Sequence, residues 1–182
     1  PSIVFDKTAP TVGTVSITSN NTNSTATNAV GTLAKPGDLL TLLFTFSEAI
    51  ASPVVVIAGQ TPTSLTNTTG NTWQATYLTT ATTTEGAVAF TIDFTDAAAN
   101  AGTQFTQAGL TGDNVTFDGT APAITPVTIV SNNTFTHFAK TGDLVTLTFT
   151  SNEDIDTRQL SENPPVLTVT MAGALPSSGT GN

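Results

Sequence analysis

One stretch of this chain returns farther along in almost the same letters, and that repetition limits what the chain can fold into. Residues 5–10 read FDKTAP and residues 117–122 read FDGTAP, a shift of 112 residues (118 − 6). The later matches are SNNT at 19–22 and 131–134, and GDL at 37–39 and 142–144. A fixed period of this size is typical of tandem modules that fold by the same rules.

The repeat predicts two domains, a first module at residues 1–118 and a second at residues 119–182. The second copy reaches the counterpart of Gly59 near Gly173 and stops before the counterparts of Trp73 and Asp96. About 60 residues hold too few strands to close a core alone. We therefore expect the second copy to be incomplete and the sequence to be a window of a longer protein.

Charge and composition exclude several function classes. Four Lys and Arg residues stand against thirteen Asp and Glu, which gives a net charge of −9, and the basic residues are scattered. A nucleic-acid surface needs clustered Lys and Arg, so we expect no nucleic-acid partner. No apolar run is long enough to cross a bilayer, so we expect no membrane contact in this region. Cysteine is absent, which rules out disulfides.

Alternating apolar residues dominate the first module and predict β-strands rather than helices. One apolar face comprises Leu40, Leu42, Phe44 and Phe46, and another comprises Val88, Phe90, Ile92 and Phe94. Strands are predicted near 12–18, 39–46, 53–58, 62–67, 72–78, 87–95 and 114–117. Seven short antiparallel strands in about 110 residues indicate an all-β fold, a seven-stranded immunoglobulin-like β-sandwich repeated in tandem. Trp73 is predicted to fill the core.

Six short segments of the first module follow one another in a fixed order. They are DKTAP at 6–10, KPGD at 35–38, FSE at 46–48, NTW at 71–73, EG at 85–86 and DAAAN at 96–100. In this order they resemble the bacterial immunoglobulin-like tandem repeats of large surface adhesins and biofilm-associated proteins. The resemblance implies a secreted, elongated stalk that holds a binding tip away from the cell. One departure is Ala99, where a glycine is usual.

Acidic and amide side chains are expected to gather at the module junctions, because alternating strands bring the N-terminus and three loops to one end of a sandwich. At the leading end of module 1 these are Asp6, Glu48, Asp96 and Asn100. At the leading end of module 2 they are Asp118, Glu153, Asp154 and Asp156, facing Asp38 and Glu85. Converging oxygen ligands are what calcium requires, so these residues are candidate ligands for a junction calcium.

A second interpretation of the acidic residues needs no metal. Asp, Asn and Glu favour loops because of their turn chemistry and solvation, and Lys7 could neutralise its neighbour Asp6. Both interpretations stay open at the level of sequence.

An enzyme is not expected. His137 is the only histidine and has no nucleophile signature near it, so we interpret it as a loop residue. Adjacent carboxylates such as Glu153 and Asp154 point apart in extended chain. The sequence also lacks a phosphate-binding glycine loop and zinc-ligand spacing.

The sequence favours a structural spacer module of a large exported cell-surface protein, with neighbouring modules of the same chain as its partners. A second hypothesis is a self-assembling subunit of an extracellular filament, sheath or surface layer, in which strands from other copies of the chain complete the second module. A third is a Thr-rich face, such as Thr14, Ser16 and Thr18, that binds glycan or ice. We expect an extracellular or cell-surface location under each hypothesis.

Overall fold

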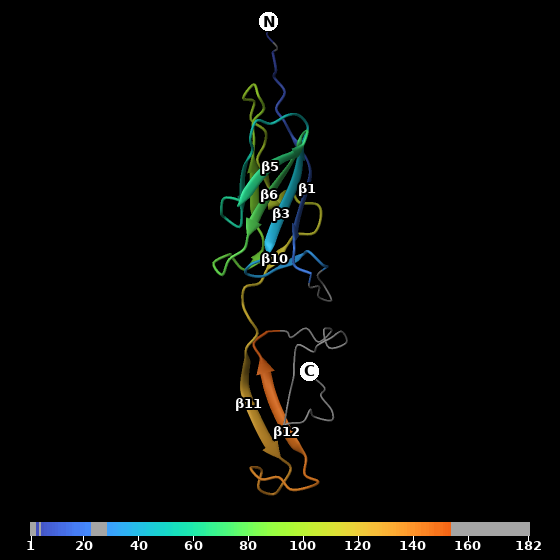
Figure 1. Ribbon diagram of the computed structural model, residues 1–182, viewed down its shortest axis with the longest axis vertical. Coiled ribbons are helices and arrows are strands. Elements are labelled where there is room, and N and C mark those ends of the chain that lie inside the picture. Colours follow the sequence, from blue (N-terminus) through green and yellow to red (C-terminus); the bar gives the residue numbers. More distant parts are fainter. Residues whose placement is uncertain (1–2, 4, 23–28, 154–182) are drawn as a thin grey trace. The chain divides into compact units, whose positions relative to one another are not determined.

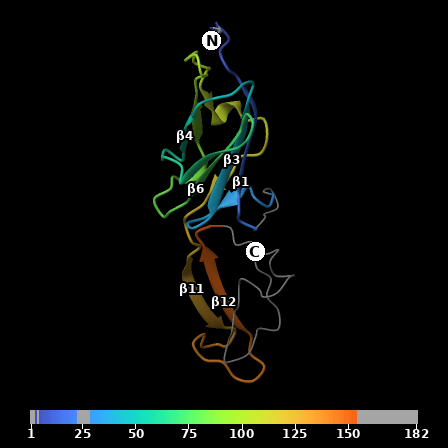
Figure 2. The same ribbon diagram turned by 45° about the horizontal axis from the view of Figure 1, so that its top comes forward.

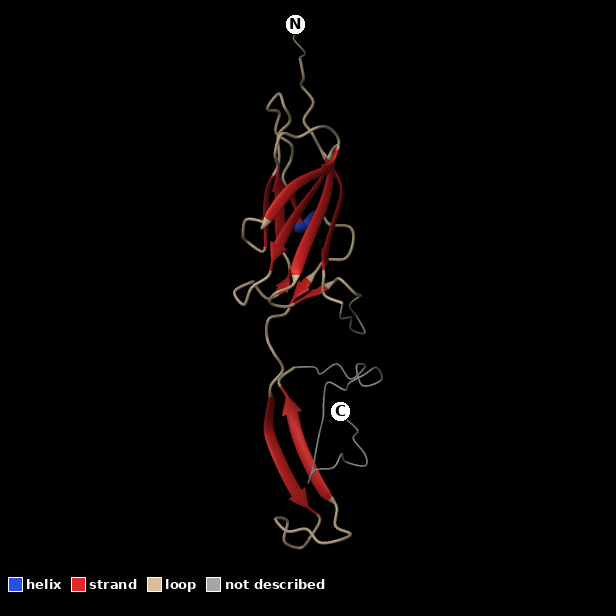
Figure 3. Ribbon diagram, viewed as in Figure 1, coloured by secondary structure: helices blue, strands red, loops and turns tan. Residues whose placement is uncertain are grey.

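The computed structural model describes residues 3, 5–22 and 29–153, which form two compact units, Pro1–Gly119 and Thr120–Asn182. Two of the predicted calcium ligands, Asp154 and Asp156, lie outside the described residues, as does the segment near Gly173. The described chain is all-β, with a single 3-10 turn at Gln107–Gly109 (Figure 3).

The described residues of unit 1 form ten strands. They are β1 (Val12–Ser19), β2 (Leu33–Ala34), β3 (Leu39–Phe46), β4 (Val54–Ile57), β5 (Ser64–Thr69), β6 (Thr72–Leu78), β7 (Gly86–Ala87), β8 (Phe90–Asp93), β9 (Phe105–Thr106) and β10 (Thr116–Phe117). One antiparallel sheet has the order β1-β3-β6-β5, whose strands run side by side (Figures 1 and 2). Two smaller sheets have the orders β4-β8-β9 and β2-β10-β7.

The core of unit 1 lies between the four-stranded sheet and the smaller sheets. Every second residue of β3 is buried, and Phe90 and Ile92 of β8 belong to the same apolar cluster. Phe46 ends β3 and Phe94 directly follows β8, and the centroids of their two rings are 4.6 Å apart. Trp73 is buried in this cluster, as its alternation predicts. Opposed antiparallel sheets with one shared core are consistent with a β-sandwich.

The small sheets differ from the strand prediction. The predicted strand at 87–95 is two short strands, β7 and β8, with a break at Val88 and Ala89. The pair β2 and β10 is parallel, and β9 was not predicted at all. Two-residue strands such as β2 and β9 are too short to show an alternating pattern, so periodicity cannot find them.

Unit 2 contains one hairpin among its described residues, β11 (Ile124–Ser131) and β12 (Val145–Ser151). Its register repeats that of β1 and β3. Ile129 pairs with Leu147 as Ile17 pairs with Leu42, and each hairpin has a register shift near its entry, at Val12/Val15 and at Ile124/Val127. The repeat in the sequence is therefore a repeat in strand pairing.

A polar clamp in the loop that connects the two strands of each hairpin repeats as well. In unit 1, Asp38 Oδ2 accepts hydrogen bonds from Asn21 Nδ2 at 2.6 Å and from the Lys35 amide at 2.8 Å. In unit 2, Asp143 Oδ2 accepts from Asn133 Nδ2 at 2.7 Å and from the Lys140 amide at 2.9 Å. Three residues in matching positions, an Asn, a Lys and an Asp, thus join the two sides of the connecting loop in both hairpins.

Candidate functional site

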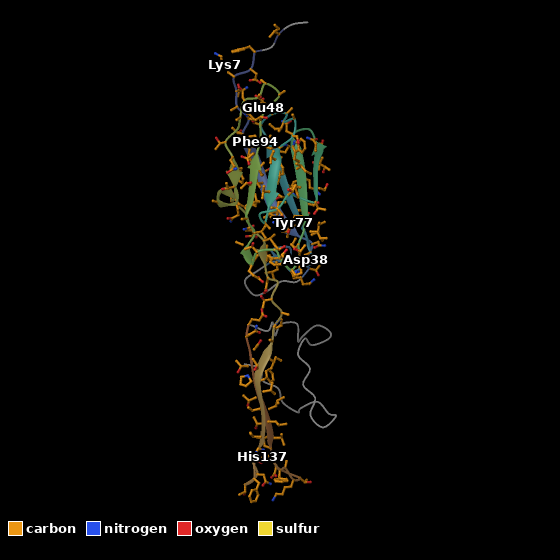
Figure 4. All side chains as sticks on the ribbon, turned by 90° about the vertical axis from the view of Figure 1, so that its left-hand side faces the viewer. Lys7, Asp38, Glu48, Tyr77, Phe94 and His137 are labelled. Carbon is orange, nitrogen blue, oxygen red and sulfur yellow. The ribbon has the colours of Figure 1, made fainter. Side chains whose placement is uncertain are left out.

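Three predicted carboxylates meet at one end of unit 1. Asp6 precedes β1, Glu48 follows β3 and Asp96 follows β8, and one oxygen from each lies within 4.8 Å of the other two. Glu48 lies at the end of the unit that holds Lys7, while Asp38 lies at the opposite end (Figure 4). We call Asp6, Glu48 and Asp96 the acidic cluster.

Asp96 is the most firmly fixed member of the acidic cluster. Its Oδ1 accepts the backbone amides of Ala98 and Asn100, both at 2.8 Å, and its Oδ2 accepts Asn100 Nδ2 at 2.8 Å. The Asn100 side-chain amide, together with backbone donors, holds the pKa of Asp96 below its usual value despite partial burial. Asp96 is therefore ionised at neutral pH and cannot move far.

The loop that fixes Asp96 turns at Ala99, which has a φ of 67°. This left-handed conformation is favourable for glycine and costs an L-residue free energy. Ala99 therefore occupies a backbone conformation that favours glycine.

Glu48 has the opposite electrostatic environment. Partial desolvation, followed by the negative charges of Asp6 and Asp96, raises the pKa of Glu48. The described residues show no hydrogen bond or ion pair to its carboxylate. Ionised Glu48 therefore faces two neighbouring negative charges without a countercharge from the described protein.

The structure does not pair Lys7 with Asp6. The Lys7 ammonium lies 5.3 Å from the centroid of the Phe5 ring, and the ion pair found among the described residues joins Lys35 to Asp38. Asn100 Nδ2 instead reaches the Asp6 backbone carbonyl at 3.4 Å. Neutralisation of Asp6 by Lys7, one of the two interpretations of the sequence, has no contact to support it.

The oxygens of the acidic cluster are close enough to share one cation. Three atoms that are at most 4.8 Å apart have a common point within about 2.8 Å of each, and calcium takes oxygen ligands at about 2.3–2.6 Å. The cluster therefore comes close to the spacing that a calcium ion needs. Asp6, Glu48 and Asp96 would supply carboxylates, and the Asp6 carbonyl and the Asn100 side chain border the same space.

The remaining predicted ligands are not brought into one described site. The Asp118 amide bonds to the Ala34 carbonyl in unit 1. Glu153, in unit 2, is half-buried, and its Oε1 is enclosed without a hydrogen-bond partner among the described residues. Glu85 accepts the Gly119 amide at 3.0 and 3.1 Å, and Asp38 belongs to the polar clamp. Asp38 and Glu85 thus have structural partners inside unit 1.

Other residues that the sequence analysis selected have ordinary surroundings. Thr14, Ser16 and Thr18 are exposed on β1, facing away from the core. His137 is exposed in the turn between β11 and β12 (Figure 4). A hollow of about 230 Å³ lies between β1 and the segment 105–111, with Val15, Phe105 and Leu110 among its lining residues.

Comparison with protein-family models, with curated proteins and with solved structures finds no match to this chain. Among the described residues, no helix has the length and apolar character needed to cross a bilayer.

Proposed function

We propose that this chain is a structural spacer, a pair of tandem immunoglobulin-like modules in the stalk of a large exported cell-surface protein that serves adhesion or an extracellular appendage. The mechanism is mechanical. Unit 1 is a small β unit held by its own core, and such modules joined in series would extend the protein without chemistry of their own.

The observation that carries this proposal is the repetition of one hairpin in two units. The strand register, the register shift near the start of the first strand and the polar clamp all recur in both hairpins. The loops that connect the strands differ in length. Stalks are built from such repeated units because stability then depends on each repeat and its neighbours. The resemblance of the sequence to adhesin repeats supports the same function, and with it an extracellular location.

We further propose that the acidic cluster binds calcium in the spacer. The support is the meeting of three carboxylates from three separate segments, one of which, Glu48, has no countercharge among the described residues. A bound divalent cation would remove the repulsion that raises the pKa of Glu48. It would also tie the N-terminal segment at Asp6 to the loops after β3 and β8, and so stiffen the entry to the module.

Single-molecule pulling tests the spacer function. The chain is tethered at its two ends and extended at constant velocity. About 100 ordered residues of unit 1, at about 3.5 Å each when extended, predict one discrete step of about 300–350 Å after subtraction of the folded length. Gradual extension without that step would show that unit 1 is not a mechanical module.

Thermal melting with and without calcium tests the cation site. Millimolar calcium should raise the melting temperature of the wild-type chain and should not raise that of Glu48→Gln. Asp113→Asn, which removes one exposed carboxylate far along the chain from the acidic cluster, is the control and should keep the calcium response. Equal melting temperatures of the wild type with chelator and with calcium would remove the calcium proposal.

When calcium is absent, Glu48→Gln should differ from the wild type in the opposite direction, by a gain in stability. The folded-state pKa of Glu48 is raised above 4.5, so its ionisation destabilises the folded state as pH rises through that folded value. Glu48→Gln should therefore be more stable than the wild type at neutral pH in chelator, and the difference should vanish in acid. A variant that lowers stability in chelator would indicate a structural role for Glu48 instead.

A further inference from the structure

Two apolar residues before β1 are exposed, although their counterparts in the repeat are buried. Ile3 is 99% exposed and Phe5 is 80% exposed. The shift of 112 residues (117 − 5) places them at Val115 and Phe117, which are 0% and 1% exposed in unit 1. Residues 3–6 read IVFD and residues 115–118 read VTFD. The segment at 3–5 therefore has the sequence of a core strand, while Ile3 and Phe5 lie outside the core of unit 1.

Unit 1 shows what surrounds such a segment when it is buried. Phe117 belongs to β10, which lies between β2 and β7 in a three-stranded sheet. β10 runs parallel to β2, with Phe117 beside Ala34, and antiparallel to β7, with Phe117 beside Gly86. Directly after β10, the Asp118 amide donates to the Ala34 carbonyl at 2.8 Å. The segment is thus the strand that closes the core at the end of the unit.

Unit 1 cannot itself enclose the segment at 3–5. The place between its β2 and β7 is filled by its own β10. The end of β2 lies next to the Lys35 amide that bonds to Asp38, and Asp38 and Lys7 lie at opposite ends of unit 1 (Figure 4). The partner of the segment is therefore a β2–β7 pair that does not belong to unit 1.

The charge of Lys7 fits the same position in the repeat. Lys7 stands where the second copy has Gly119, and the Gly119 amide donates to both carboxylate oxygens of Glu85, at 3.0 and 3.1 Å. A Cβ at Gly119 would lie 3.2 Å from Glu85 Oε1 and 3.0 Å from the Phe117 ring, so a side chain needs only a small adjustment. A lysine there would begin beside a carboxylate of opposite charge, which attracts it at short range.

We propose that residues 3–5 form the closing strand of a preceding module of the same kind in the same polypeptide. The segment lies between the β2-like and β7-like strands of that module, where Ile3 and Phe5 fill its core and Lys7 pairs with its counterpart of Glu85. The Asp6 amide is then held by the preceding module, while the Asp6 carboxylate belongs to the acidic cluster of unit 1. This proposal rests on the spacer function and names the partner of its N-terminal segment.

A tandem protein tests the proposal. Residues 1–112 are joined directly in front of Pro1 of the full chain, so the added copy lacks its own β10 and only residues 1–6 of the full chain stand in place of 113–118. Pulled from its two ends, this protein should unfold in two steps of similar length, whereas the chain itself gives one. A single step would overturn the proposal and leave the spacer function intact. Loss of every step would remove both.

The matched control is the same tandem protein with Ile3→Thr and Phe5→Thr in the full-chain part, which keeps length, charge and β propensity. It should give one step, and two steps would overturn the proposal. In the chain without the added copy, the same two substitutions should leave the melting temperature unchanged, because both side chains are exposed. A clear loss there would show that the segment serves unit 1 instead.

Hydrogen exchange locates the strand without force. The Asp6 amide should be protected in the tandem protein and unprotected in the control, because its counterpart at Asp118 donates to the Ala34 carbonyl. An unprotected Asp6 amide in the tandem protein would overturn the proposal. Protection of this amide in the chain without the added copy would do so too, since another partner would already hold the segment.

Discussion

Phe44 is the residue whose truncation tests the arrangement of the core most directly. It lies in the middle of β3, is fully buried, and pairs with Val15 on one side and Trp73 on the other. Its ring meets Phe46 edge to face at a centroid distance of 5.5 Å. Phe44→Ala removes this ring from a region where both flanking strands are fixed by their hydrogen bonds, so the space cannot close by strand movement.

The expected cost of Phe44→Ala is about 3–5 kcal/mol, which is the range for a buried aromatic residue replaced by alanine. Burial of a phenyl side chain accounts for about 2–3 kcal/mol of this, and the residual cavity accounts for the remainder. Unit 1 spans 119 residues, and at about 2.1 cal/mol/K per residue its unfolding entropy is about 0.25 kcal/mol/K. The melting temperature should therefore fall by about 12–20 °C.

Urea denaturation followed by tryptophan fluorescence reads this change in unit 1 alone. Trp73 is the only tryptophan of the chain and is buried in unit 1. Leu43→Ala is the matched control, because Leu43 is the neighbour of Phe44 on the outer face and is 40% exposed. It should cost less than about 1 kcal/mol. Similar costs for the two variants would show that the faces of β3 are assigned incorrectly.

Three smaller changes, one of them with a matched control, test the loops by the same assay. Gly102→Ala should destabilise unit 1 by about 1–3 kcal/mol, because a Cβ there would lie 2.0 Å from the Phe94 ring. Gly112→Ala is its control and should be nearly neutral, because a Cβ at that position meets no atom within 4 Å. Ala99→Gly should raise stability by up to about 1 kcal/mol, since it relieves the left-handed backbone at the cost of unfolded-state entropy; a clear loss would contradict this account. Asp38→Ala should cost about 2–3 kcal/mol at neutral pH, and the variant should lose less stability in acid than the wild type. A parallel acid profile for both proteins would show that the polar clamp does not act through the Asp38 carboxylate.

The acid dependence of the polar clamp follows from the pKa of Asp38. Partial burial acts to raise that pKa, but the Lys35 amide, the Asn21 side chain and the Lys35 charge together lower it below 3.8. A depressed folded-state pKa means that the carboxylate stabilises the folded state above 3.8 and that this contribution is lost as pH falls through the folded value. Asp143 has a lowered pKa in unit 2 for a similar reason, chiefly the Asn133 side-chain amide.

Long alternating segments were predictable from the sequence, and short ones were not. The apolar series of β3 and the series from Phe90 to Phe94 indicate buried faces because every second residue is large and apolar. The strands β2, β7 and β9 have two residues each, so they exist only through their tertiary neighbours. Whether unit 1 has the full immunoglobulin-like topology stays a prediction.

The acidic cluster could be predicted in outline, because loop position follows from strand alternation. The orientation of individual side chains could not. Nothing in the sequence indicates that Lys7 lies over Phe5 rather than beside Asp6, or that the Asn100 amide bonds to Asp96. These side-chain orientations depend on the local backbone, such as the left-handed turn at Ala99. In the sequence, Ala99 is only one alanine in a run of three.

The polar clamp explains how two hairpins with different loops reach the same register. The connection between β1 and β3 is longer than that between β11 and β12, so loop length cannot set the pairing. A slip of one residue would turn Ile17 or Ile129 from one face of its hairpin to the other. The bonds from Asn21 to Asp38, and from Asn133 to Asp143, join fixed positions beside the two strands and exclude that slip. Because both clamp bonds lie within their own hairpin, the information that sets the register is local to the hairpin.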